Sequence, residues 1–211
     1  MICCYILYMS LLSVRKNIRF APLNYVGYQC YFVTLCTFHR QNVFLDSTHC
    51  KEVLSRLKAE CASRNFSVLA YCVMPDRLHF LAEGLDPASD LLHFVKSLKS
   101  KTSRKYAARE GRTLWQKGFY EHILHPGENL ELVAWYIWLN PVRKRLVSRA
   151  QDYAFSGSFN GMKMPVTWDV LDWRPPWNSR QGAARLGRLA LRRNGKPDTS
   201  RSKVSCNEPL T

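Results

Sequence analysis

The order of apolar and polar residues along the chain predicts a body that mixes strands and helices. Residues 31–38 and 66–74 are rich in β-branched and aromatic side chains, a composition typical of buried strands. A Pro-Asp pair then marks a turn, and residues 78–84 return as the second arm of a hairpin. Residues 119–125 form a fourth predicted strand.

Three other segments place apolar residues at the three- and four-residue steps of an amphipathic helix. They span residues 47–64, where Ser47 is the expected cap, residues 90–108 and residues 128–139. The elements therefore follow the order strand, helix, strand, strand, helix, strand, helix. This order predicts an α+β ferredoxin-like sandwich, in which an antiparallel sheet of four to five strands carries helices on one face and an added C-terminal helix.

Basic residues outnumber acidic ones, with 31 Lys and Arg against 16 Asp and Glu and a formal net charge of +15. A polyanion such as DNA, RNA or an anionic membrane surface is therefore the expected partner. Residues 178–211 hold eight Lys or Arg and two Asp or Glu, and they predict a basic, disordered tail. The rest of the chain stays strongly basic, so the expectation does not depend on this tail.

The amino-terminal residues 1–24 are interpreted as an extension, and residues 25–177 as one catalytic and DNA-binding domain. Residues 1–14 are apolar but too few to cross a bilayer, and the positive charge follows them rather than precedes them as in a signal peptide. Membrane association through this segment is the alternative. The eight cysteines include no CxxC pair, which excludes zinc-ribbon and thioredoxin-like spacings and favours reduced thiols in a cytoplasmic protein.

Two segments, residues 70–84 and 115–147, carry the candidate chemistry. They contain the phrases MPD-x-LH, LWQ-x-x-FY-x-H and YI-x-x-NPVRK-x-LV in that order. Together they closely resemble the REP-associated tyrosine transposases, a group of insertion-sequence-200-like HUH transposases that act on single-stranded DNA. The resemblance covers residues 25–155 and implies a ferredoxin-like fold, in agreement with the order of the predicted elements.

The resemblance also implies a mechanism and the residues that perform it. A tyrosine phenolate attacks a DNA phosphodiester, which gives a 5′-phosphotyrosine and a free 3′-OH, while Mg²⁺ or Mn²⁺ polarises the phosphate. The family's nucleophile falls on Tyr136, and its metal ligands fall on His79 and Asn140. Positions four residues apart share a helix face. Pro141 predicts that Asn140 leaves helical geometry, so that the helix ends near Asn140. Tyr106 and Tyr120 are interpreted as packing residues.

The chain departs from the family pattern at one ligand. Two histidines in an H-x-H pattern normally hold the metal, because alternate residues of a strand face the same side. Here the tripeptide is Arg77-Leu78-His79, and a protonated guanidinium cannot bind a metal ion. Either Arg77 holds the scissile phosphate directly, or cleavage is lost while DNA binding remains. Asp76 either serves the turn or supplies a substitute oxygen ligand.

Further basic, amide and aromatic side chains are candidates for DNA contacts. Those after the tyrosine helix suit phosphate binding, those on the second helix either follow a DNA backbone or form a solvated face, and the Trp115 indole either stacks on an unpaired base or packs in the core. The predicted contacts are Arg77, Lys96, Lys99, Arg104, Lys105, Trp115, Gln116, Lys117, Arg143, Lys144 and Arg145.

The sequence therefore predicts a protein, monomeric or homodimeric, that cleaves and rejoins single-stranded hairpin DNA of a palindromic repeat type. The alternative is a catalytically inactive nucleic-acid-binding member of the same family. A ferredoxin-like sheet also occurs in RRM domains, but the chain lacks an RNP-type aromatic run, which argues against RNA recognition of that kind.

Overall fold

A computed structural model describes residues 25–164 and 173–178. The chain divides into two compact units, Met1–Leu171 and Asp172–Thr211. The predicted amino-terminal extension and nearly all of the predicted basic tail lie outside the described residues. In the second unit, the described part holds one 3₁₀ turn, η5 (Pro176–Asn178).

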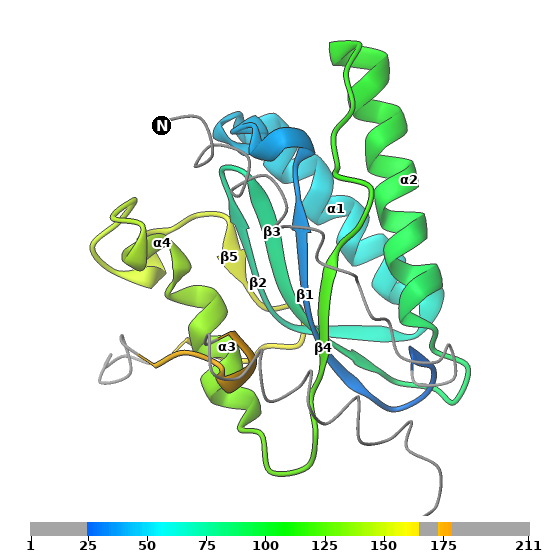
Figure 1. Ribbon diagram of the computed structural model, residues 1–211, viewed down its shortest axis with the longest axis vertical. Coiled ribbons are helices and arrows are strands. Elements are labelled where there is room, and N and C mark those ends of the chain that lie inside the picture. Colours follow the sequence, from blue (N-terminus) through cyan, green and yellow to red (C-terminus); the bar gives the residue numbers. More distant parts are fainter. Residues whose placement is uncertain (1–24, 165–172, 179–211) are drawn as a thin grey trace, which may run out of the picture. The chain divides into compact units, whose positions relative to one another are not determined.

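The first unit is built on one five-stranded antiparallel sheet (Figure 1). The strands lie in the order β4-β1-β3-β2-β5, and the first four follow the order of a ferredoxin-like sandwich, which confirms the predicted fold class. Their bounds are β1 (Cys30–Cys36), β2 (Phe66–Met74), β3 (Arg77–Gly84), β4 (Tyr120–Ile123) and β5 (Ser156–Gly157).

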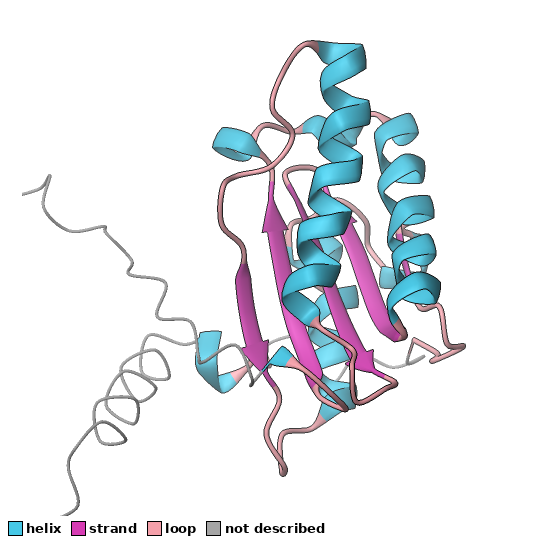
Figure 2. Ribbon diagram, turned by 90° about the vertical axis from the view of Figure 1, so that its right-hand side faces the viewer, coloured by secondary structure: helices cyan, strands magenta, loops and turns pink. Residues whose placement is uncertain are grey.

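Two long helices, α1 (Ser47–Arg64) and α2 (Leu91–Glu110), cover one face of this sheet (Figure 2). Asp46 caps α1 by accepting a hydrogen bond from the Thr48 N–H at 2.7 Å, so the expected cap, Ser47, is instead the first helical residue. Asp90 caps α2 in the same way, and Gly111 ends it with a φ of +64°. Within the described residues, no helix is both long and apolar enough to cross a bilayer.

A shorter helix, α3 (Leu130–Trp138), packs against β2 and β3, and the single turn α4 (Asn140–Arg143) follows it (Figure 1). Asn129 caps α3 by accepting from the Leu132 N–H at 3.0 Å, so this helix begins two residues later than the sequence pattern predicted. Three 3₁₀ turns complete the unit: η2 (Phe38–Arg40), η3 (Val43–Leu45) and η4 (Ala150–Asp152).

Each face of the sheet has its own buried side chains because strand residues alternate between faces. On the α1/α2 face the core includes Val33, Leu57, Val73, Phe80, Phe94 and Leu98. On the other face the buried apolar side chains include Phe32, Cys72, Leu81, Ala134, Ile137 and Trp138. All five described cysteines are free thiols, and Cys72 is fully buried.

The loop from β1 to α1 is fastened to the turn between β2 and β3. The buried Thr37 donates its hydroxyl to the carbonyls of Gln41 at 2.7 Å and Asp76 at 2.9 Å, and its N–H donates to Asp76 at 3.0 Å. Between these anchors, His39 and Arg40 have φ angles of +49° and +54°. Two consecutive residues in the left-handed region are costly for non-glycine side chains, so the anchoring bonds hold a strained turn at this end of the sheet.

Candidate active site

Tyr136, the predicted nucleophile, lies in the last turn of α3 and is half-buried against the sheet. Its ring centroid is 6.0 Å from that of Phe32 on β1. The Arg143 guanidinium carbon lies 4.7 Å from the tyrosine ring centroid, and its Nη1 donates to the Tyr136 carbonyl at 2.9 Å. The ring is therefore held between an aromatic platform and a cation that remains partly exposed.

His79, a predicted metal ligand, sits on β3 and faces the same side of the sheet as Phe32 and Thr34. Its ring stacks on Phe32 with centroids 5.9 Å apart, and its Nδ1 lies 2.8 Å from the Thr34 hydroxyl. Burial, with the positive charges of Arg77 and Arg40, lowers the pKa of His79 to about 3. The imidazole is therefore neutral at physiological pH, which is the form that ligates metals and makes neutral hydrogen bonds.

Asn140, the other predicted ligand, stands at a break between helices. Pro141 has no N–H to donate to the Ile137 carbonyl four residues earlier. The Asn140 side-chain nitrogen takes that role, donating to the carbonyls of Tyr136 at 2.9 Å and Ile137 at 3.2 Å. Helix α3 does end before Asn140, but the prediction that Pro141 drives Asn140 out of helical geometry is wrong, because Asn140 opens α4 with the proline in its first turn.

Arg77 lies two residues before His79 and on the same face of β3. Its Nε and Nη2 donate to the two carboxylate oxygens of Asp76 at 2.7 and 2.9 Å. Arg40 approaches the same carboxylate from the β1–α1 loop, with its Nη1 3.4 Å from Asp76 Oδ2. Asp76 is therefore held by two arginines, which does not favour the interpretation that it serves as a metal ligand.

The donors present do not make a complete metal site. Within residues 25–164 and 173–178, no group of three or more His, Cys, Asp or Glu side chains is placed to hold a metal ion. His79 offers one neutral nitrogen and Asn140 one amide oxygen, while the position of the first family ligand carries a guanidinium bound to a carboxylate. Two neutral donors beside a positive charge do not fit a divalent cation.

The basic residues after Tyr136 lie on the surface of the helix break. Lys144 and Arg145 are exposed directly after α4, and Arg145 has a φ of +56° that turns the chain away from the helix. Together with Arg143 they place three positive charges within nine residues of the predicted nucleophile. This placement is compatible with phosphate binding by these side chains, which stays a prediction.

Trp115 lies in the core of the α1/α2 face. It is 3% exposed, packs 5.5 Å from Phe44 and donates its indole N–H to the Thr102 hydroxyl at 2.8 Å. Its faces are covered, so of the two interpretations of this residue the placement favours packing over stacking on a base.

Lys99 holds the irregular backbone next to β4. Its ammonium donates to the carbonyls of Gln116 at 2.7 Å, Lys117 at 3.1 Å and Gly118 at 2.9 Å. Thr34 pairs with Tyr120, whereas Thr37, three residues later, forms an isolated bridge with Trp115, five residues earlier. The pairing with β1 therefore shifts by two residues within the segment that Lys99 holds. Lys99 is thus a structural cation, whereas Lys117 is exposed and Gln116 is partly exposed.

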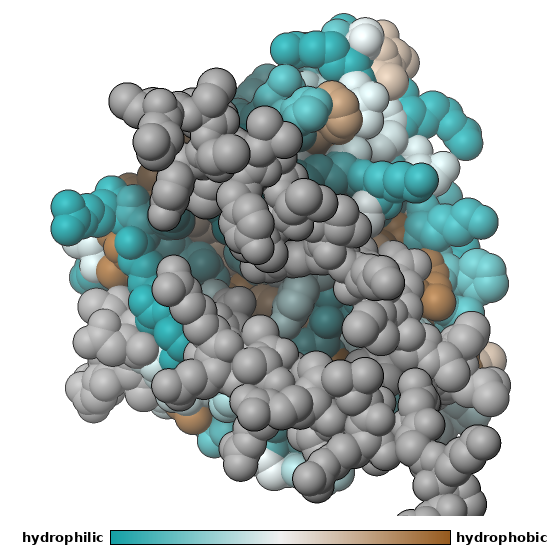
Figure 3. Space-filling view, viewed as in Figure 1, coloured by the Kyte–Doolittle hydropathy of each residue, from teal (hydrophilic) through white to brown (hydrophobic). Residues whose placement is uncertain are grey.

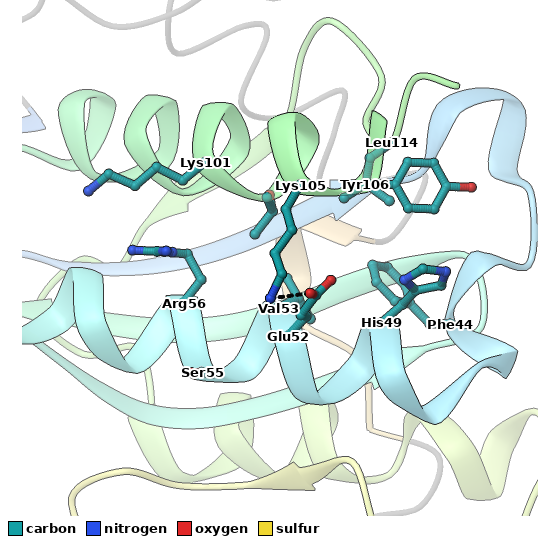
Figure 4. A pocket seen from close by; sticks show the side chains of 11 residues that line it. Phe44, His49, Glu52, Val53, Ser55, Arg56, Lys101, Lys105, Tyr106 and Leu114 are labelled. Carbon is teal, nitrogen blue, oxygen red and sulfur yellow. Dashed lines mark ion pairs between the residues drawn. The ribbon is translucent and has the colours of Figure 1, made fainter. Parts of the chain in front are cut away.

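The remaining predicted contacts lie on the outer surface of α2, where hydrophilic side chains gather in Figure 3. Lys96 and Arg104 are exposed. Lys105 forms an ion pair with Glu52 across a cavity of about 90 Å³ between α1 and α2 (Figure 4). These side chains belong to the sheet face opposite Tyr136, so the structure divides the predicted DNA contacts between two faces.

Several residues of the site carried no signal in the sequence. Phe32 and Thr34 lie in an ordinary strand pattern, and only the pairing of β1 with β3 brings them to His79. Tyr120 is 39% exposed on the same face, with its ring 6.1 Å from Phe32, so it is less buried than a packing residue. Tyr106 is 4% exposed in the core, as predicted for a packing residue.

His122 links β4 to the start of α3. It is 8% exposed, and its Nε2 lies 2.9 Å from Oε2 of Glu128, which also accepts from the His125 N–H at 2.7 Å. Burial lowers the pKa of His122 more than Glu128 raises it. The pair of His122 and the partly buried Glu128 therefore links the end of β4 to the residues just before α3.

The chain is similar in sequence to known proteins. The sequence profile of the family described as "Transposase IS200 like" matches residues 26–139, more than half of the chain. A Haemophilus influenzae protein provisionally named a REP-associated tyrosine transposase is 24% identical over an alignment of 148 residues, gaps included, that covers 64% of this chain and 83% of that relative. The REP-associated tyrosine transposase of Escherichia coli K12 is 27% identical over an alignment of 119 residues that covers 52% of this chain and 68% of the relative.

A solved structure has a similar fold. The REP-associated tyrosine transposase bound to a REP hairpin superposes with a TM-score of 0.59 at 19% identity, covering 76% of this chain and 92% of that one. At this identity the likeness concerns the fold.

Proposed function

Because the chain belongs to the IS200-like transposase family, we propose that it is a REP-associated tyrosine transposase that cleaves and rejoins single-stranded hairpin DNA of a palindromic repeat type. The names of its relatives and the hairpin bound by the solved structure motivate this substrate. DNA as a substrate implies a cytoplasmic protein, in line with the free thiols of the described residues. Whether it acts as a monomer or a homodimer stays a prediction.

One observation carries the proposal: the side-chain rings of Tyr136 and His79 both pack against the ring of Phe32. Phe32 lies 6.0 Å from the tyrosine ring and 5.9 Å from the imidazole, although the three residues come from α3, β3 and β1. A helix that merely covered the sheet would place apolar side chains there. Instead, a half-buried phenol and a buried neutral imidazole lie beside the same ring, and the partly exposed Arg143 packs on the phenol.

The proposed reaction is a transesterification at phosphorus. The phenol oxygen of Tyr136 loses its proton and attacks the phosphate, the bond from phosphorus to the 3′-oxygen breaks, and a 3′-OH and a 5′-phosphotyrosine result. Attack by a 3′-OH on this intermediate releases the tyrosine and rejoins the strand. Arg143 orients the ring and, with Lys144 and Arg145, binds the phosphates beside the cleavage point.

Transposases of this family generally depend on a divalent metal ion, but the residues of this chain do not provide a complete site for one. We therefore derive no step through Mg²⁺ or Mn²⁺. The pairing of Arg77 with Asp76, at the position of the first family ligand, favours a second candidate function. In that alternative the protein binds the hairpin without cleaving it.

The test is a covalent-adduct assay. The purified protein is mixed with 5′- and 3′-labelled hairpin DNA in Mg²⁺, Mn²⁺ or EDTA, and covalent complexes are separated on denaturing gels. We expect an adduct with the wild type and none with Tyr136→Phe, because phenylalanine keeps the packing on Phe32 but has no nucleophile. Tyr120→Phe is the matched control and should keep the adduct, since this second tyrosine lies beside the same ring.

An adduct that persists in Tyr136→Phe contradicts the assignment of the nucleophile. An adduct that forms only in Arg77→His identifies the natural protein as a hairpin-binding member that has lost its first metal ligand.

A further inference from the structure

Two arginines, Arg40 from the β1–α1 loop and Arg77 from the start of β3, share the Asp76 carboxylate beside the candidate site. We propose that Arg40 and Arg77, oriented by Asp76, form a clamp for a phosphate of the DNA backbone next to the candidate cleavage point. This inference rests on the proposed function only for the identity of the polyanion as DNA. Arg40 carried no signal in the sequence motifs, and the fold alone brings it to Arg77.

The geometry leaves the right donors available. Arg77 uses Nε and Nη2 to bind Asp76 at 2.7 and 2.9 Å, so its other edge, Nη1 with the second N–H of Nη2, can still donate. A guanidinium held on one edge by a carboxylate keeps a fixed orientation, and its free edge matches two phosphate oxygens. The Arg77 side chain is 25% exposed, so DNA can reach it.

Arg40 adds a second cation whose position is held by the backbone. Arg40 lies in the strained turn with a φ of +54°. It stands between His39 and Gln41, and the Gln41 carbonyl accepts a hydrogen bond from the Thr37 hydroxyl. Its side chain is 54% exposed, with Nη1 3.4 Å from Asp76 Oδ2. Strain of this kind persists where the surrounding structure imposes it, and it often marks binding sites.

The charges of the group do not cancel. Burial would raise the pKa of Asp76, but hydrogen bonds and charges from Arg77 and Arg40 lower it, so the carboxylate stays ionised. Two guanidinium groups against one carboxylate leave a net positive charge at the rim of the sheet. An ionised Asp76 therefore orients the pair without neutralising it.

The clamp lies within reach of the candidate cleavage point. Arg77 and His79 are two residues apart on one strand face, a separation of roughly 7 Å along the strand. Arg77 pairs with Cys36 on β1, directly before the anchored loop that carries Arg40. A DNA strand whose phosphate lies at His79 and Tyr136 can thus place the neighbouring phosphate between the two arginines.

The test is the salt dependence of hairpin binding, measured by fluorescence anisotropy in EDTA. Each phosphate contact contributes about 0.7–0.9 to the slope of log K against log salt concentration. We expect Arg40→Asn and Arg77→Gln each to lower the slope by about that amount and to weaken binding about fivefold or more at low salt. Asparagine at position 40 removes the charge and tolerates a positive φ.

Three further variants separate the clamp from other effects. Arg40→Lys keeps the charge and should keep most of the slope. Arg109→Gln is the matched control, since Arg109 also pairs with one carboxylate, Glu52 at 3.0 Å, but on α2, and its slope should equal that of the wild type. The double variant Asp76→Asn/Arg77→Gln leaves no unpaired carboxylate and should reproduce the loss if Arg77→Gln alone unfolds the protein.

The proposal is overturned if Arg40→Asn and Arg77→Gln have the slope of the wild type, or if only one of them differs. The adduct assay judges a different claim. If the wild type forms no adduct but the variants show the expected change in slope, the cleavage proposal is rejected and the clamp proposal is kept. If the wild type forms the adduct but the variants have unchanged slopes, only the clamp proposal is rejected. If the wild type binds no hairpin, both claims fail.

Discussion

The two faces of the sheet use the same strands for different purposes. On the α1/α2 face, Glu60 accepts from Lys101 and Arg64, and Trp115 donates to Thr102, although the buried Tyr31 hydroxyl has no hydrogen-bond partner among the described residues. On the α3 face, Phe32 is surrounded by a neutral histidine and two tyrosines, one of them exposed. The α1/α2 face is therefore mainly a packed core. The α3 face instead carries titratable side chains, of which Tyr120 is exposed and Tyr136 is partly exposed.

This difference between the two faces shows which cations are used within the fold and which lie near the candidate site. Lys99 and Lys105 carry full charges, but the first binds three carbonyls and the second binds Glu52. Arg143, Lys144 and Arg145, on the other side, stand at a helix break next to Tyr136. Composition alone counts these cations as equal, whereas the fold assigns some to structure and leaves others near the site.

The largest expected effect compares one buried phenylalanine from each face. Phe94 is fully buried 4.8 Å from Phe66, and Phe32 is 2% exposed beneath Tyr136. We expect Phe94→Ala and Phe32→Ala each to lower the free energy of unfolding by about 3–5 kcal/mol, because both leave a cavity. Urea denaturation measures the stability, and the adduct assay below the unfolding transition measures the activity.

Only Phe32→Ala should reduce adduct formation per folded molecule, since it removes the ring that Tyr136 and His79 share. Equal losses of activity in the two variants would show that the faces are not separable, and intact activity in Phe32→Ala would remove the observation on which the proposed site depends.

A smaller effect should appear in the pH dependence of stability. Burial holds the pKa of His122 below its ordinary value of 6.5. The unfolded chain then binds more protons than the folded one, so stability is complete above about pH 6.5 and declines as the pH falls below it. We expect His122→Gln to flatten this decline between pH 6.5 and 5 and to cost about 1–2 kcal/mol at pH 7, as measured by thermal unfolding.

Glu60→Gln is the matched control on the other face. Burial opposes ionisation of Glu60, but hydrogen bonds from Lys101, Ser97 and Arg64 outweigh it and lower its pKa below 4.5. Its contribution is therefore present above about pH 4.5 and lost below it. His79, whose pKa is lowered to about 3, also contributes to this decline and is unchanged in both variants. If Glu60→Gln alters the decline between pH 6.5 and 5, or if His122→Gln leaves it unchanged, the assignment of part of the decline to His122 is wrong.

The smallest effect concerns Trp115. Trp115→Phe removes the hydrogen bond to Thr102 but keeps an aromatic ring in the core, so we expect a loss of about 1 kcal/mol in stability. The affinity of the folded protein for single-stranded DNA should stay the same. A drop of tenfold or more in affinity would restore base stacking as the role of this residue.

The repeating patterns predicted most of the fold because they depend on local physics. The bounds of α1 and β2 agree with the predicted ranges residue for residue, since a capped amphipathic helix and a β-branched run are set by near neighbours. Strand β4 is shorter than predicted, because only Tyr120–Ile123 pair with β1 and the His125 N–H donates to the Glu128 side chain instead.

The candidate site was only partly predictable. The motif around Tyr136 predicted the nucleophile and the basic residues after it, because these lie close together in sequence, and both roles stay predictions. Thr34, Phe32 and Arg40 were missed, since each meets its partner only through strand pairing or through the anchored loop between β1 and α1. The role of Asn140 in satisfying the carbonyls at the helix break also depends on a geometry that the proline did not reveal.

The sequence by itself determined the order of the elements, the family resemblance, the strong positive charge and the replacement of a histidine by Arg77, because these depend on residue identity and spacing. Only the tertiary structure decided which cations are used inside the fold, which two tyrosines lie beside Phe32 and which second arginine joins Arg77 at Asp76. The physical reason is that hydrogen bonds, burial and shared charges join residues far apart in the chain, and such contacts exist only after the sheet has paired.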